Sequence, residues 1–158
     1  MSKKGFTLIE LLIIMIILGV IAAMISGNFM TSLKKGRDAK RKADLESMQK
    51  AMELYYEDQR RYPPSINAGS PLNDSVSGKV YMQSIPYDPK GTRYEYETDA
   101  TGSYYRLFAC LENNLQILPY TANGATFPIT CSVQCMDLSD TASDCVWVVS
   151  STNVPPIP

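Results

Sequence analysis

Two sets of residues in this sequence have types and spacing that imply chemistry: a lone carboxylate in an apolar run, and four cysteines. The carboxylate is Glu10, the only charge between Phe6 and Ile25. A carboxylate at this depth in a membrane helix costs about 2.5–3.5 kcal/mol unless it is paired or neutralised. We expect either that Glu10 reaches the lipid head groups or that a partner group compensates its charge.

The cysteines form an even set in the last third of the chain: Cys110, Cys131, Cys135 and Cys145. Even sets outside the reducing cytosol are typical of disulfides, so we expect two bonds, although three connectivities fit the sequence. Closing a loop on the scale of Cys131 to Cys145 stabilises a protein by about 3 kcal/mol. Zinc is the alternative, but a C-x₃-C pair with distant flanking cysteines is poor ligand spacing.

Histidine is absent from the 158 residues. This absence excludes the commonest general base, the commonest metal ligand and every nucleophile that an imidazole activates. The sequence also has no glycine-rich phosphate-binding loop. Few catalytic mechanisms therefore remain open to this chain.

The elements that carry these groups differ between the two parts of the chain. Residues 1–61 hold eleven basic and seven acidic residues and no proline, whereas residues 62–158 hold four basic, nine acidic and all ten prolines. Residues 6–25 would span ~30 Å as a helix, which is the thickness of one hydrocarbon core. A secretory signal peptide is the rival, but the run exceeds an h-region and no A-x-A site follows it.

Residues 28–61 continue as a predicted amphipathic helix, which the pair Pro63-Pro64 ends. Its apolar stripe consists of Leu45, Met48, Met52, Tyr55 and Tyr56, widened by Ala39, Ala43 and Ala51. A basic cluster precedes the stripe: Lys34, Lys35, Arg37, Lys40, Arg41 and Lys42. We expect this cluster to face lipid head groups or acidic heads of neighbouring copies. Nucleic acid is an unlikely partner because no aromatic side chains alternate with these charges.

The second part of the sequence predicts a small antiparallel sheet. Alternating residues in 93–98 and 103–111, separated by Asp99-Ala100-Thr101-Gly102, predict a hairpin with one face on the helix stripe. Residues 126–131 and 145–150 are candidates for further strands.

The front of the chain resembles a known family. Lys3-Lys4-Gly5, followed by Phe6-Thr7-Leu8-Ile9-Glu10-Leu11-Leu12, is similar to the processing site and helix start of type IV pilins and type II secretion pseudopilins. The resemblance implies that a prepilin peptidase cuts between Gly5 and Phe6 and methylates the new terminus at Phe6. It also implies that this amine pairs with Glu10 of a neighbouring subunit in a filament. Residues 85–89, 94–96 and 104–107 resemble, less specifically, the sheet of major pseudopilins.

The resemblance to major pseudopilins also implies a calcium site in a carboxyl-terminal loop. The candidate ligands are Asp137, Asp140 and Asp144, which lack an EF-hand pattern and suit a solvated acidic loop better than a calcium site. Calcium is therefore a weak prediction, and we expect no other cofactor.

Together these observations predict an α+β protein, with a long helix packed on a small antiparallel sheet head and a cysteine-rich end. The expected parts are a leader (1–5), a transmembrane and filament-core helix (6–27), an amphipathic continuation (28–61) and an extracytoplasmic head (62–158). The resemblance implies a structural subunit of a type IV pilus-like filament, with a major pseudopilin of type II secretion as the alternative, and we therefore predict that the chain is not an enzyme. A membrane-anchored extracytoplasmic binding module is a third hypothesis.

The expected partners are other copies of the chain, the prepilin peptidase, an inner-membrane assembly platform and, before assembly, membrane lipid. The expected location is a single-pass cell membrane protein with its head outside the cytoplasm. After assembly it would belong to a cell-surface pilus or a periplasmic pseudopilus.

Overall fold

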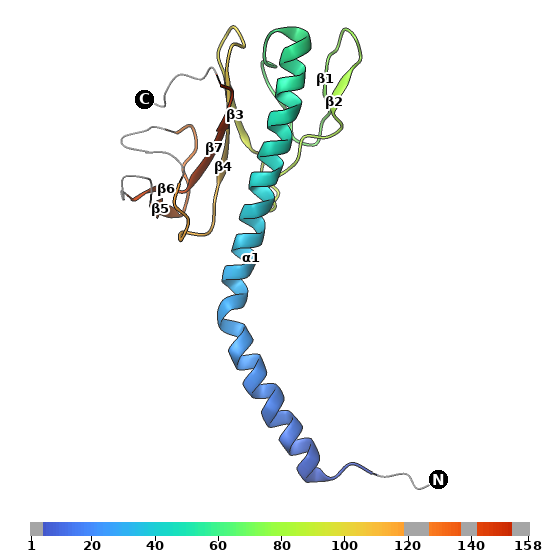
Figure 1. The fold of residues 1–158 in the computed structure, drawn as a ribbon, viewed down its shortest axis with the longest axis vertical. Helices are drawn as coiled ribbons and strands as arrows, with labels where there is room; N and C mark the ends of the chain where they lie inside the picture. Colours follow the sequence, from blue (N-terminus) through green and yellow to red (C-terminus); the bar gives the residue numbers. More distant parts are fainter. Residues whose placement is uncertain (1–4, 119–126, 137–141, 153–158) are drawn as a thin grey trace. The chain divides into compact units, whose positions relative to one another are not determined.

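The computed structural model of the protein describes residues 5–118, 127–136 and 142–152, and in these ranges one long helix precedes short strands (Figure 1). The elements are α1 (Leu8–Gln59), β1 (Leu72–Asn73), β2 (Val80–Met82), β3 (Glu95–Thr98), β4 (Tyr105–Cys110), β5 (Gln134–Met136), β6 (Ala142–Asp144) and β7 (Val146–Ser150). The strands form three antiparallel sheets with the orders β1-β2, β3-β4-β7 and β5-β6. The predicted α+β class is confirmed.

The residues of the chain divide into two compact units, Met1–Lys34 and Lys35–Pro158, which we call the N-terminal unit and the head unit. Among the described residues, no single uninterrupted helical segment combines the length and the hydropathy of a membrane span. The segments Leu8–Met24 and Phe29–Gln59 meet those limits only when they are taken as a pair. The apolar composition of the N-terminal unit indicates membrane anchoring.

α1 ends at Gln59, two residues before the predicted end. Arg60 adopts a left-handed conformation with φ of 57°, and its N–H donates to the carbonyl of Tyr56 at 2.8 Å. A left-handed residue directly after the last turn is a common way to stop a helix and to satisfy a terminal carbonyl. Pro63 and Pro64, which follow in the chain, then prevent the helix from resuming.

The predicted hairpin is formed by β3 and β4, whose register pairs Glu95 with Phe108 and Thr98 with Tyr105. Strand β7 lies on the other side of β4 and pairs Val149 with Leu107. Side chains of a strand alternate between its two faces. Tyr105, Leu107 and Ala109 of β4 therefore share one face and are buried in the main core.

The main core lies between the head-unit part of α1 and this sheet, with the β1-β2 pair also packing on α1 (Figure 1). The predicted stripe forms it, since Leu45, Met48, Met52 and Tyr55 are all buried. Two of the alanines assigned to the stripe, Ala39 and Ala43, are exposed instead. In the part of α1 before Leu45 the buried positions are Asp38, Arg41 and Asp44, so the two alanines lie on the opposite face of the helix.

The carboxyl-terminal segment covers the opposite face of the sheet. The disulfide between Cys110 and Cys131 attaches it to β4, and Phe127 contacts Phe108 edge to face with ring centroids 6.3 Å apart. The strand predicted at residues 126–131 is wrong for the described residues 127–131, which are irregular. Pro128 explains part of this, because proline removes a donor from a strand ladder.

The turn between β3 and β4 depends on a glycine with almost no space around it. Gly102 has φ of +70°, its N–H donates to Asp99, and its carbonyl accepts from Tyr62 N–H at 2.8 Å. A β-carbon at this position would lie 2.8 Å from the Tyr62 carbonyl oxygen and 3.1 Å from the β-carbon of Arg61.

We expect Gly102→Ala to lower the free energy of unfolding by about 1–3 kcal/mol, because both the backbone conformation and the contact with Tyr62 become strained. Gly91→Ala is the matched control, since Gly91 has φ of +85° but open space around it. Denaturant unfolding of the full chain in detergent, followed by the fluorescence of the single tryptophan, Trp147, measures both losses. Equal losses in the two variants would contradict the contact argument.

Candidate functional site

The start of α1 is the first candidate site, because the residues from the predicted cleavage point to Met24 are all exposed. Gly5 has nothing within 4 Å of the position that a β-carbon would occupy, and Phe6 is 75% exposed. The Glu10 N–H donates to the Thr7 side-chain oxygen at 3.3 Å, so Thr7 caps the helix and Glu10 is its third residue. Threonine followed three residues later by glutamate is the capping-box sequence.

The capping position gives Glu10 a local role that sequence reasoning did not identify. A carboxylate in the first turn of a helix interacts favourably with the unpaired N–H groups there. The Glu10 side chain is nevertheless exposed, and the residues after it as far as Met24 are apolar or glycine and are exposed as well. The carboxylate therefore lies at one end of a large uncovered apolar surface.

A second cluster joins α1 to the head within the head unit, and we call it the junction. Its centre is Arg41, which is 2% exposed. The guanidinium donates to Asp38 at 2.7 Å, lies 2.8 Å from Glu112, and makes two bonds to Asp88, one of them through Nη2 at 3.0 Å. The three carboxylates come from α1, from the segment before β3 and from the segment after β4. One side chain thus ties three parts of the sequence together.

Asp38 provides the second half of the junction and is also 2% exposed. Its carboxylate accepts bonds from the N–H groups of Glu112 and Asn113 and from the Gln116 amide, at distances between 2.8 and 3.1 Å. These bonds hold the chain after β4 against α1. Buried carboxylates with this many donors are satisfied structural groups, with little capacity left for a ligand.

The junction contradicts part of the expected role of the basic cluster. Arg37 makes a bidentate pair with Glu112 at 2.9 and 2.7 Å, and Lys42 contacts Gln116 and lies 4.1 Å from the centre of the Trp147 ring. Arg41 is buried among carboxylates, as described above. These three cations bind their own head, so they are not available to lipid or to a neighbouring copy in the way that the sequence predicted.

The electrostatics of the junction favour its fully ionised form. Hydrogen bonds from Arg37 lower the pKa of Glu112 far below its usual range; burial opposes this effect, and bonds from Arg41 and Lys90 reinforce it. Burial raises the pKa of Asp88, but the bonds from Arg41 outweigh it and the net direction is downward. Burial likewise disfavours the charge on Arg41, yet its bonds to Asp88 and Glu112 raise its pKa.

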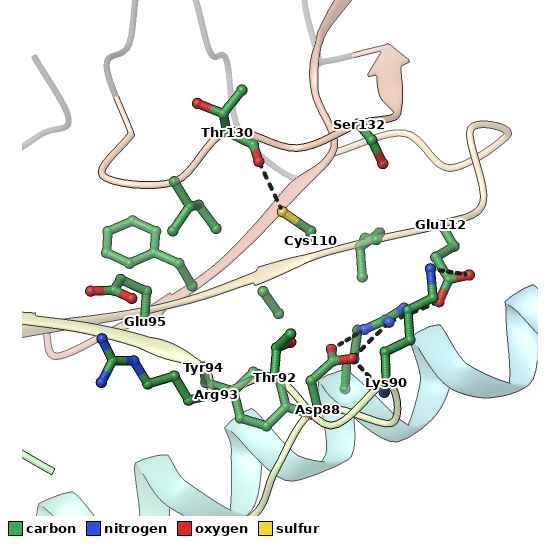
Figure 2. A pocket seen from close by; sticks show the side chains of 15 residues that line it. Asp88, Lys90, Thr92, Arg93, Tyr94, Glu95, Cys110, Glu112, Thr130 and Ser132 are labelled. Atoms are coloured by element: carbon green, nitrogen blue, oxygen red, sulfur yellow. Dashed lines mark hydrogen bonds and ion pairs between the residues drawn. The ribbon is translucent and has the colours of Figure 1, made fainter. Parts of the chain in front are cut away.

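A pocket of about 280 Å³ opens beside the junction (Figure 2). Figure 2 shows Asp88, Lys90 and Glu112 gathered at one end of it, while Cys110 and Thr130 lie on the opposite wall. The carboxylates at this end are already bound to cations. Within the described ranges no group of three histidine, cysteine or acidic side chains is arranged to hold a metal ion.

The cysteines pair in sequence order, Cys110 with Cys131 and Cys135 with Cys145, and their Cα atoms are 5.5 and 5.0 Å apart. Asp144 accepts a bond from the N–H of Cys131 at 3.0 Å, so this calcium candidate supports the disulfide-bearing segment. The other two candidates, Asp137 and Asp140, lie outside the described residues, and calcium binding stays a prediction.

Two models of known protein families match this chain. The model of the prokaryotic N-terminal methylation motif matches residues 1–26, and the model of type II secretion system protein G matches residues 28–115. No solved structure gives a significant match. The family model ends at residue 115, so three of the four cysteines lie beyond it.

Curated relatives share the name type II secretion system core protein G. The protein from Pectobacterium carotovorum subsp. carotovorum is 31% identical over 105 residues, which cover 59% of this chain and 65% of that protein. The Pseudomonas aeruginosa protein is 26% identical over 117 residues, covering 68% and 82%, and the Klebsiella pneumoniae protein is 29% identical over 102 residues, covering 59% and 73%. The alignment therefore spans less than two thirds of the length of the Pectobacterium protein.

We expect Arg41→Met to lower the free energy of unfolding of the full chain by about 3–5 kcal/mol, because it leaves three buried carboxylates without their common cation. Lys40→Met is the control, since the Lys40 side chain is 63% exposed and its partner Asp44, although buried, keeps the bond from the Tyr94 hydroxyl at 2.9 Å. We expect this loss to be about 1 kcal/mol. Denaturant unfolding monitored at Trp147 tests this, and a loss for Arg41→Met no larger than that of the control would contradict the central role of Arg41.

The junction also predicts a pH dependence. The pKa of Glu112 is depressed in the folded chain, whereas an unfolded glutamate titrates near about 4.3. Its contribution is therefore fully present above about pH 5 and is lost as the pH falls toward the folded pKa. Glu112→Gln should be less stable than wild type at pH 7 and lose less stability between pH 5 and pH 2. Parallel curves for the two proteins in that range would show that Glu112 is not the responsible group.

Proposed function

This chain belongs to the type II secretion system protein G family, and we propose that it is the repeating subunit of a periplasmic pseudopilus. The observation that carries the proposal is the match to that family over residues 28–115, directly after the methylation motif. Its role is structural, and the prediction that the chain is not an enzyme is confirmed, because the matching family is a secretion-system core protein.

The alternative of the sequence analysis therefore replaces its main prediction, a type IV pilus subunit. The front motif could not separate the two, since pilins and pseudopilins share it. Three of the four cysteines lie after the region that matches the family, so they do not bear on the choice between the two. The family match extends over the β3-β4 hairpin and Glu112 of the junction, so it includes part of the head and not only the front of the chain. This match to the head supports the pseudopilin.

Processing of the chain follows from the methylation motif. A prepilin peptidase would cut between Gly5 and Phe6, where the backbone is accessible, and would methylate the amine of Phe6. The remaining parts are then the membrane and filament-core helix (6–27), its continuation (28–61) and the head (62–158). The chain would cross the membrane once with its head in the periplasm, and an inner-membrane platform would extract it into the filament.

Assembly would transfer the exposed apolar surface of residues 8–24 from lipid to the helices of other copies. Lipid and helix surfaces are equally apolar, so specificity has to come from packing and from polar pairs. Cleavage would leave Phe6 with a free amino group that carries a positive charge. Its pairing with Glu10 of an adjacent copy would neutralise both charges in a medium where an unpaired charge is expensive.

We expect Glu10→Gln to be inserted and processed normally but to form few or no filaments. Glutamine retains the capping-box contact and removes only the charge, so the start of α1 remains intact. Thr7→Ala is the complementary control, because it removes the cap and keeps the carboxylate. Electron microscopy of cells that carry the secretion machinery counts the filaments, and wild-type numbers from Glu10→Gln would refute the pairing role.

A further inference from the structure

The turn that follows β4 presents two large aliphatic side chains to solvent. Leu115 is 76% exposed and Ile117 is 67% exposed, whereas Asn113 and Leu118 on either side of them are buried. The segment between these two buried residues reads Asn-Leu-Gln-Ile and carries no charge. Neighbouring apolar side chains in water indicate an interaction surface only when a second observation supports it. Here the turn is held rigidly and has cations beside it.

Hydrogen bonds to α1 hold this turn in one conformation. The Asn113 N–H donates to Asp38 at 2.8 Å. The Gln116 side chain also donates to Asp38, at 2.9 Å, and accepts from Lys42 at 2.5 Å. The backbone on both sides of Leu115 is therefore bound, and the exposure of the two aliphatic side chains is a property of the fold. A partner would meet them already in place, so little conformational freedom would be lost on binding.

Exposed lysines lie beside the turn. Lys35 precedes Asp38 by three residues and Lys42 by seven, so it shares the face of α1 that holds the turn, and it is exposed. Lys90 lies 3.1 Å from Glu112, yet 58% of its side chain is exposed, whereas that of Glu112 is only 9% exposed. Figure 2 shows Lys90 and Glu112 together at one end of the pocket. The surface around the turn therefore offers lysines to a partner and keeps the carboxylates of Asp38 and Glu112 buried.

The uncharged part of α1 limits how far this turn can lie from a membrane. No charged residue occurs between Glu10 and Lys34. The 23 residues between them are helical and would be ~35 Å long, so a tilt of about 30° fits them to a hydrocarbon core of ~30 Å. Glu10 and Lys34 would then lie in the two head-group layers. Asp38, which binds the turn, follows Leu33 by five residues, or about 7.5 Å of helix, and one head-group layer is about 5–8 Å thick.

We propose that the turn after β4 docks the head of the unassembled chain on an anionic lipid membrane: Leu115 and Ile117 enter the interfacial layer, and Lys35 and Lys90 bind the head groups. Apolar side chains at the boundary between head groups and acyl chains, with lysines beside them, suit an anionic lipid surface. A protein partner fits the turn less well, because binding hot spots are rich in Trp, Tyr and Arg and poor in Leu. The inference rests on the proposed membrane anchoring and adds a lipid contact made by the head itself.

Quenching of tryptophan fluorescence by lipids with brominated acyl chains tests the contact in the full chain before assembly. The chain is reconstituted in vesicles of an equal mixture of phosphatidylcholine and phosphatidylglycerol. The single native tryptophan is removed by Trp147→Phe, so that an introduced tryptophan is the only reporter. Leu115→Trp should be quenched at least about twofold more strongly than a control position, because an inserted side chain lies about 5–10 Å into the boundary of the acyl chains. Ile117→Trp is a second reporter, which replaces the first if Leu115→Trp unfolds.

Val76→Trp is the matched control. Val76 is 93% exposed and lies in the turn between β1 and β2. That hairpin is bound to α1 through Lys79 and Asp58, at 2.5 Å. Asp58 follows Asp38 by twenty residues, which is about 30 Å of helix, so the control position is equally exposed but attached to the other end of the head-unit part of α1.

The electrostatic part of the proposal has its own pair of variants. Added to Leu115→Trp, Lys35→Glu should remove at least about half of the excess quenching, because it replaces an attraction to anionic lipid with a repulsion. Lys50→Glu reverses an exposed lysine fifteen residues further along α1 and should leave the quenching unchanged. Vesicles of phosphatidylcholine alone should lower the quenching, and so should 1 M salt, in which the screening length is only about 3 Å. Circular dichroism of each variant in detergent checks that the head remains folded.

The outcomes separate this contact from the proposed function. If the wild-type chain does not float with the vesicles, the proposed membrane anchoring fails and this inference fails with it. If the chain is anchored but the turn after β4 is quenched no more than the Val76→Trp control, only the docking of the head is overturned. Protection of the turn in assembled filaments but not in vesicles would also overturn it, because the partner would then be a protein. Equal losses for Lys35→Glu and Lys50→Glu would contradict the role of the lysines beside the turn.

Discussion

A single helix in this chain has to satisfy two different environments, and the distribution of its side chains follows from that constraint. From Leu8 to Met24 the side chains are apolar and exposed on every side, so only lipid or other helices can cover them. From Leu45 to Tyr55 the head covers one face of the same helix. Residues 35–44 lie between these regimes, and there the buried positions are charged.

The junction explains why buried charges are tolerated at that place. Arg41 is matched by carboxylates that reach it from segments 47 and 71 residues further along the chain. An apolar face can slide by one turn at modest cost, whereas a buried guanidinium has to meet its own set of acceptors. We interpret the junction as the element that fixes the register of α1 against the head.

The sequence predicted those features whose signals are local. The apolar run and Glu10 define the front, the alternation around Asp99 to Gly102 predicts the hairpin, and the Leu45 to Tyr55 stripe predicts the core. It did not predict the junction, because Arg41 reads as one more surface cation and its partners are distant in the chain. Nor did it predict β5 and β6, since each strand has only three residues and the bond between Cys135 and Cys145, which joins β5 to the residue directly after β6, could not be assigned from the sequence.

Mass spectrometry of the mature chain, taken from the filament fraction of wild-type cells, tests the central claim most directly. The account predicts a polypeptide that begins at N-methylated Phe6, since this terminus is the cation that assembly requires. A chain that retains Met1, recovered only from membranes as a dispersed monomer, would contradict the account.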